Sequence, residues 1–224
     1  MEDRSATRIV DLSHVITEGM VTFKGLPGPH ICDFISREQS AANYDAGETF
    51  QIGRIDMIAN TGTYVDVPSH RYADGKDLSE VGVDAFAHLP AIVVRQPFES
   101  RLAVDVAAFE ALDVRGHAVL VATGWDRHWG SDDYYNDHPF LTAQAADWLV
   151  QNGAVLVGID SHNIDDTRVR TRPVHSTLLG AGIPICEHMT GLGALPDNGF
   201  RFSAAPPKVR GMGTFPVRAY AVLS

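Results

Sequence analysis

The segment spanning residues 60–70, NTGTYVDVPSH, gathers side chains of the types that bind metal ions or transfer protons. Tyr64 and Asp66 stand two positions apart, so they point to the same face of an extended chain. Pro68 interrupts such a strand, and the resulting bend can bring His70 close to both side chains. These residues suit a metal or acid–base site, but they also suit a loop in which the three side chains satisfy one another. Spacing alone leaves both interpretations open.

A second pair of reactive side chains lies in RPVHSTLLGAGIPICEHM, where His175 and Glu187 are twelve residues apart. Glu187 follows an apolar, strand-like run, and burying its carboxylate is costly without a cation, a hydrogen-bond donor or a metal. Arg168, Arg170 and Arg172 stand nearby in the sequence. An ion pair with one of them is therefore an alternative to a metal site.

Two tryptophans, Trp125 and Trp129, occur in TGWDRHWG and could form part of the core or the wall of an aromatic pocket. The usual burial of tryptophan favours the core. The histidines other than His70 and His175 share no spacing pattern. We expect most of them to be surface or hydrogen-bonded structural residues.

The elements that must position these residues are predicted from apolar patterning. β-Branched runs predict strands within residues 8–16 and 91–96, and residues 31–36 and 50–60 have the alternation of two strands that could pair. The second of these two leads directly into residues 60–70. The polar segment should therefore lie where a strand ends in a turn.

The middle of the chain predicts a strand–helix–strand unit. The apolar runs 117–125 and 154–160 resemble buried strands, and between them a helix is expected from a Thr142 cap to a stop at Gly153. Asp105 is expected to cap another helix over VDVAAFEAL. Further on, a short helix and a strand ending near Glu187 are expected, followed by strands broken by Pro and Gly.

Bulk composition narrows the classes of function. The 224 residues are 45% hydrophobic, which predicts a single domain over residues 1–224. A formal net charge of −10 argues against a nucleic-acid or anionic-membrane surface and favours a small-molecule partner. No run is long and apolar enough for a membrane span, so we expect a cytoplasmic protein. Cys32 and Cys186 are expected to be reduced thiols.

Five ordered motifs spread over nearly the whole chain resemble the cyclase or kynurenine formamidase (arylformamidase) family, which includes isatin hydrolases. The motifs are DLSHVITEGM, NTGTYVDVPSH, TGWDRHWGSDDYYNDHPFLTAQAADWLVQNGAVLVGIDSHNID, HSTLLGAGIPICEHMTGLGALP and APPKVRGMGTFPVRAYA. The resemblance implies an α/β fold of the swivelling β/β/α type, a mixed sheet with barrel-like strands and flanking helices. It also implies a homo-oligomer, a homodimer or homotetramer, in which the early loop completes a neighbour's pocket.

The same resemblance implies roles for particular residues. The family's first motif places metal ligands at the positions of Asn60, Tyr64 and Asp66, where the first two are histidines in the family. Its last histidine, a general acid–base, matches His70. A second family metal position shares the aspartate and adds a His and a Glu twelve residues apart, which match His175 and Glu187.

The departure from the family pattern is therefore confined to one of two metal positions. Asparagine and tyrosine are weaker zinc donors than imidazole, so a two-metal centre is not expected. One divalent ion, zinc or manganese, on Asp66, His175 and Glu187 is expected instead, with Asn60 and Tyr64 as hydrogen-bond donors to the reacting carbonyl. Phe23, Trp125 and Trp129 are the expected substrate-binding walls.

The predicted function is metal-dependent hydrolysis of a small amide, aryl formamide or cyclic amide, of the kind associated with tryptophan and kynurenine compounds. The alternative is a metal-free cyclase or dehydratase, or a small-molecule-binding protein, on the same fold. Measuring bound metal separates the two.

Overall fold

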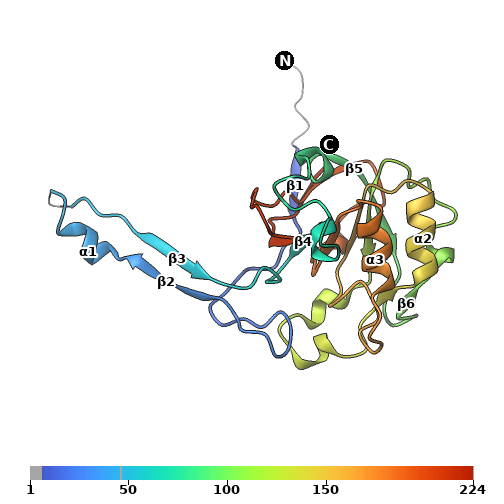
Figure 1. Ribbon diagram of the computed structural model, residues 1–224, viewed down its shortest axis with the longest axis horizontal. Coiled ribbons are helices and arrows are strands. Elements are labelled where there is room, and N and C mark those ends of the chain that lie inside the picture. The colour runs from blue at the N-terminus through green and yellow to red at the C-terminus, as the bar shows by residue number, and fades with distance from the viewer. Residues whose placement is uncertain (1–6, 46, 224) are drawn as a thin grey trace, which may run out of the picture.

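A curled mixed sheet, shaped like half a barrel, forms the body of the protein (Figure 1). The computed structural model describes residues 7–45 and 47–223. Among these, nine strands hydrogen bond in the order β1-β13-β11-β5-β7-β9-β10-β4-β12. Their bounds are β1 Arg8–Asp11, β4 Tyr64–Asp66, β5 Leu89–Arg95, β7 Ala118–Ala122, β9 Leu156–Ile159, β10 Ile185–Glu187, β11 Phe200–Ser203, β12 Thr214–Pro216 and β13 Tyr220–Leu223. The predicted mixed α/β class is confirmed.

The centre of the sheet is parallel, and its flanks are antiparallel. Strands β5, β7, β9 and β10 run parallel, whereas β4, β11 and β13 pair with their neighbours in the opposite direction. Helix α2 (Ala143–Gln151) connects β7 to β9, which confirms the predicted strand–helix–strand unit. The Thr142 hydroxyl accepts a hydrogen bond from the Ala145 N–H at 3.2 Å, so the predicted cap is also present.

Alternation along the central strands divides the apolar side chains between two cores. In β7, Val119 and Val121 face α2 and α3 (Pro173–Gly180), whereas Leu120 packs on the opposite side of the sheet. Helices α2 and α3 lie side by side over the first of these faces (Figure 1). Because both faces are covered, the central strands are apolar throughout.

One predicted helix is shorter than expected. Asp105 does cap a helical turn, accepting from the Ala107 N–H, but the turn is a 3₁₀ helix over Val106–Ala108. It ends where Phe109 becomes fully buried, with its ring 6.2 Å from that of Trp148 on α2. Packing against α2 thus overrides the modest helix propensity of the sequence.

A two-stranded arm projects from the body (Figure 1). It consists of β2 (His30–Ile35) and β3 (Ile52–Asp56), which pair antiparallel as predicted, with the short helix α1 (Arg37–Ala41) near its tip. Both strands are largely exposed to solvent. The arm therefore contributes little to the core of its own chain.

Smaller elements complete the fold. A second two-stranded sheet pairs β6 (Ala103–Val104) with β8 (Phe140–Leu141). Further 3₁₀ turns span Pro68–His70, Val83–Ala85, Trp125–His128, Asp132–Tyr135 and Leu192–Ala194. Cys32 and Cys186 are free thiols. Within the described ranges, none of the helices is long and apolar enough to cross a membrane.

Candidate metal centre and active site

Strand β4 sits between β10 and β12, and this pairing assembles the polar segment with residues far away in sequence. Tyr64 lies opposite Glu187 of β10, and Asp66 lies opposite Thr214 of β12. The turn that begins at Pro68 then brings His70 back toward Asp66, with 3.5 Å between His70 Nδ1 and Asp66 Oδ1. The shared face and the bend predicted for this segment are both present.

Thr214 connects Asp66 to His70. Its hydroxyl contacts Asp66 Oδ1 and lies 2.8 Å from His70 Nδ1. A carboxylate can only accept, so the hydroxyl donates to Asp66 and accepts from the His70 Nδ1–H. His70 is thereby held in the tautomer whose Nε2 carries a free lone pair.

His175 is fixed in the same way by Asp165. The two N–H groups at the start of α3, from Val174 and His175, donate to the Asp165 carboxylate at 2.8 and 3.1 Å. His175 Nδ1 also donates to Asp165 Oδ2 at 2.6 Å. The carboxylate therefore both caps the helix and leaves His175 Nε2 unprotonated when the ring is neutral.

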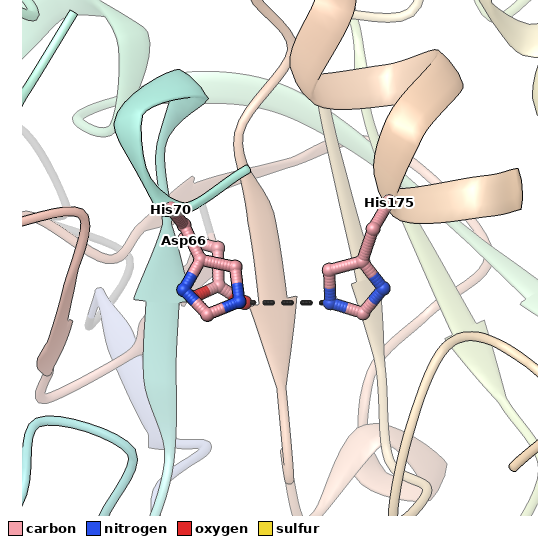
Figure 2. A group of neighbouring side chains, drawn as sticks. All are labelled: Asp66, His70 and His175. Atoms are coloured by element: carbon pink, nitrogen blue, oxygen red, sulfur yellow. Dashed lines mark ion pairs between the residues drawn. The ribbon is translucent and has the colours of Figure 1, made fainter. Parts of the chain in front are cut away.

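These contacts bring Asp66, His70 and His175 to one point. One potential ligand atom from each lies within 4.8 Å of the other two. Figure 2 shows His175, on α3, turned toward Asp66 and His70 from the opposite side, with its Nε2 3.7 Å from Asp66 Oδ2. Two of the three predicted metal ligands, Asp66 and His175, thus lie next to His70, the predicted acid–base residue.

Glu187 borders the same point. Its Oε1 lies 3.8 Å from His175 Nε2 and accepts from the Ile164 N–H at 2.6 Å. Its Oε2 accepts from the Tyr64 hydroxyl at 2.7 Å. Among the described residues Glu187 forms no ion pair with an arginine, so the alternative left open by the sequence does not occur.

The electrostatics of the centre call for a cation. Three fully buried carboxylates, Asp66, Asp165 and Glu187, surround one imidazole. Burial lowers the pKa of His175, but Glu187, Asp165 and Asp66 outweigh it and raise that pKa to about 10. Burial raises the pKa of Glu187 to about 7, against the opposing effect of His175. A proton on His175 balances part of the negative charge, and a metal ion would balance more of it.

The donor set fits a divalent ion. Asp66 Oδ2 is buried and lacks a hydrogen-bond partner among the described residues, and it faces His175 Nε2, the nitrogen that would give up its proton to bind an ion. Two ligands each about 2.0–2.2 Å from one ion can lie up to about 4.4 Å apart, so the 3.7 Å separation leaves room for it. Buried polar groups without partners are rare, and a metal ion between Asp66 Oδ2 and His175 Nε2 would give this oxygen a partner.

A cavity of about 160 Å³ opens onto this centre. Its lining consists of Phe23, Asn60, Tyr64, His70, Arg71, Asn163, Arg172, His175 and Glu187. Of the three predicted aromatic walls, only Phe23 lines it. Trp125 is buried and donates to the Tyr134 carbonyl at 3.0 Å, and Trp129 stacks on His14 at 4.0 Å.

The predicted oxyanion donors have different surroundings. Asn60 lines the cavity. Tyr64 is almost completely buried, and the one proton of its hydroxyl is donated to Glu187. Burial and the nearby Glu187 raise the pKa of Tyr64 far above its usual value, so the hydroxyl keeps that proton. Donation to a substrate carbonyl requires the bond to Glu187 to break first.

Two residues of the centre were not anticipated from the sequence. Asp165 follows shortly after the parallel strand β9, and the carboxyl ends of parallel strands are common places for functional side chains. That position was a usable signal. Thr214 lies in a strand in the C-terminal part of the chain, and nothing in its local sequence marks its contact with Asp66 and His70.

Sequence comparisons with known proteins agree on one family. Residues 10–166 match the Cyclase family. A kynurenine formamidase of Erythrobacter litoralis is 24% identical over 209 residues, which cover 92% of this chain and 89% of the relative. A kynurenine formamidase of Bacillus cytotoxicus is 25% identical, with 96% and 97% covered.

Solved structures show the same fold. Isatin hydrolase A from Labrenzia aggregata superposes with a TM-score of 0.82 at 22% identity, covering 97% of this chain and 94% of that one. A "predicted metal-dependent hydrolase" from Bacillus stearothermophilus gives a TM-score of 0.76 at 25% identity, with 97% and 99% covered.

Proposed function

The chain belongs to the Cyclase family, and we propose that it is a metal-dependent hydrolase of a small amide, an aryl formamide or a cyclic amide. The observation that carries the proposal is the buried Asp66 Oδ2, which has no hydrogen-bond partner among the described residues and lies 3.7 Å from His175 Nε2. The names of the relatives, formamidases and isatin hydrolases, support cleavage of a carbon–nitrogen bond.

We propose that one divalent ion, zinc or manganese, binds to Asp66, His175 and Glu187. Such an ion supplies Lewis acidity to the reacting carbonyl and water. His175 presents Nε2 because Asp165 holds its other nitrogen. Supporting groups of this kind orient metal-binding histidines.

His70 is the proposed proton carrier. Its Nδ1–H is donated to Thr214, so Nε2 can take a proton from the water that adds to the carbonyl carbon. The C–N bond then breaks, and His70 returns the proton to the departing nitrogen. The products are a carboxylic acid and an amine, joined in one molecule when the amide is cyclic.

The test combines metal analysis with an activity panel. Protein purified without chelator should contain about one zinc or manganese per chain, and formanilide or a lactam should be hydrolysed. Asp66→Asn should lose the metal, whereas Glu80→Gln, on the exposed surface, should keep it. His70→Ala should lose turnover and keep the metal; loss of the ion in that variant would make His70 a ligand instead.

A metal-free function is the second candidate, because a protonated His175 already balances part of the buried charge. In that case the cavity binds a small molecule, or His70 and Tyr64 transfer protons in a cyclisation or dehydration. Protein that contains no metal and hydrolyses no member of the panel would favour this candidate over the hydrolase.

We further propose a homodimer or homotetramer in which the arm packs on a second copy. Isolated two-stranded hairpins are marginally stable in water. This one exposes large apolar side chains, with Phe34 at 65% and Ile55 at 55%. Phe34→Glu should dissociate the oligomer in light scattering, whereas Val83→Glu, equally exposed on the body, should not. A wild-type monomer would contradict the proposal.

A further inference from the structure

Two arginines line the cavity beside the candidate metal centre, although the protein as a whole is acidic. Arg71 follows the turn that carries His70, and Arg172 precedes α3, which carries His175. Both side chains contribute to the wall of the 160 Å³ cavity. The cavity is thus acidic near Asp66 and Glu187 and basic where the two guanidinium groups lie.

In the described part of the chain, neither guanidinium group forms an ion pair with a carboxylate. Arg71 Nε donates to the Ser176 hydroxyl at 3.0 Å. Arg172 Nη1 donates to backbone carbonyls, including those of Val169 and Thr171 at 2.6 and 2.8 Å. Among residues 7–45 and 47–223, no carboxylate oxygen lies within 4.0 Å of either group.

The neighbouring Arg168 shows what a structural arginine looks like in this loop. Its Nε and Nη2 both donate to the Asp166 carboxylate, at 2.9 Å each. Arg172 lies only four residues away, yet its contacts with the residues that the structure describes are all neutral and leave Nε and Nη2 without a partner there. Its charge, like that of Arg71, is available to a ligand.

A third donor stands beside them. Asn163 is largely buried, and its Oδ1 accepts from the Asp165 N–H at 3.0 Å, which leaves its NH₂ group as a donor on the cavity wall. Two guanidinium groups and an amide form a set of donors that matches a carboxylate, a planar anion with two accepting oxygens.

We infer that the substrate carries a carboxylate, bound by Arg71, Arg172 and Asn163 while its amide reaches Asp66 and His175. This inference rests on the proposed function and adds the class of substrate. The cavity volume suits one small ring, since a cavity of about 150 Å³ holds benzene. The buried carboxylates of Asp66 and Glu187 would repel an anionic substrate. Cationic side chains are therefore needed at the end of the cavity where the substrate carboxylate binds.

A matched pair of substrates tests the inference. 2-Formamidobenzoate and formanilide share the aryl formamide and differ in the carboxylate. Arg71→Gln and Arg172→Gln should each lower kcat/KM for 2-formamidobenzoate by about 10- to 100-fold, the effect of losing a hydrogen bond to a charged group. The value for formanilide should change by less than about threefold.

Arg210→Gln is the matched control, because it removes the same charge from an exposed position that does not line the cavity. It should leave both substrates unaffected. Equal losses for the two substrates, or the same loss in Arg210→Gln, would overturn the inference. If Arg172→Gln fails to fold, the exposed Arg71 still carries the test.

Binding separates this inference from the proposed function. Benzoate should bind the wild-type protein more tightly than benzamide in calorimetry, and the difference should shrink in Arg71→Gln at unchanged metal content. This result can be obtained even if neither formamide is hydrolysed, an outcome that would refute only the hydrolase. Benzoate that binds no better than benzamide would overturn the carboxylate subsite.

Discussion

Replacing Tyr64 by phenylalanine removes one hydroxyl from the most buried part of the site. That hydroxyl donates to Glu187 at 2.7 Å, and both side chains are almost inaccessible to solvent. A hydrogen bond to a charged group contributes about 1.5–3 kcal/mol, compared with about 1 kcal/mol for a neutral pair. Glu187 keeps its second donor, the Ile164 N–H, so we expect a loss of about 2 kcal/mol.

Tyr134→Phe is the matched control. Tyr134 is equally buried, but its hydroxyl lies 2.9 Å from the neutral ring of His188, whose pKa burial holds well below its usual value. We expect that variant to lose about 1 kcal/mol. Urea unfolding at pH 8 measures the free energy of unfolding of both variants. The protein is first dialysed against chelator so that metal binding does not contribute. Equal losses would refute a charge-assisted bond between Tyr64 and Glu187.

Turnover of the same variant answers a separate question. If the Tyr64 hydroxyl leaves Glu187 to stabilise a developing oxyanion, Tyr64→Phe should lower kcat by roughly a hundredfold. If the hydroxyl only holds Glu187 in place, kcat should stay within a few-fold of the wild type. A large loss of stability with unchanged kcat would therefore show that Tyr64 supports the structure of the site and does not stabilise the transition state.

Three further changes test other parts of the structure. Asp165→Asn should weaken metal binding by about 10- to 100-fold, measured by competition with a chromophoric chelator, because His175 loses the partner that orients it. Gly213→Ala should reduce turnover at least tenfold, because its Cβ would lie 2.3 Å from the His70 backbone nitrogen, whereas Gly193→Ala, with nothing within 4 Å, should not. Burial, with a smaller contribution from His138, lowers the pKa of His162 to about 3, so the unfolded state takes up the proton as pH falls below about 6.5. The free energy of unfolding should then fall by up to about 1.4 kcal/mol per pH unit toward pH 4, and less steeply in His162→Asn; equal slopes in urea unfolding would contradict this assignment.

The central strands and α2 could be predicted because their signals are local. Continuous apolar runs flank a helix whose Thr142 cap is visible in the sequence, and the structure reproduces that unit. The turn after Asp105 could not be predicted to stop after three residues. The burial of Phe109 against α2 decides its length, and sequence patterning contains no information about that contact.

The candidate site divides in the same way. Tyr64, Asp66 and His70 share one short segment, so their proximity follows from a strand and a bend. That His175 and Glu187 lie near Asp66 was predicted only from the family resemblance. Their position depends on β10 pairing with β4, which is more than a hundred residues away in the sequence. Thr214 was missed because its role exists only once β12 has paired with β4.

The presence of Asn60 and Tyr64, where the family resemblance implies histidines, also bears on which ion the proposed centre would favour. Asn60 and Tyr64 stand where the family resemblance implies two imidazoles. The proposed ligand set then has two carboxylates, Asp66 and Glu187, and one imidazole, His175, because His70 is assigned to proton transfer. Both oxygens of Glu187 already accept hydrogen bonds, so the unpartnered oxygen of Asp66 is the donor best able to bind strongly. A set dominated by carboxylate oxygens suits manganese better than zinc, which prefers nitrogen and sulfur. Metal analysis of the purified protein decides between them, and zinc retained in excess of manganese would show that the geometry of the pocket outweighs its donor chemistry.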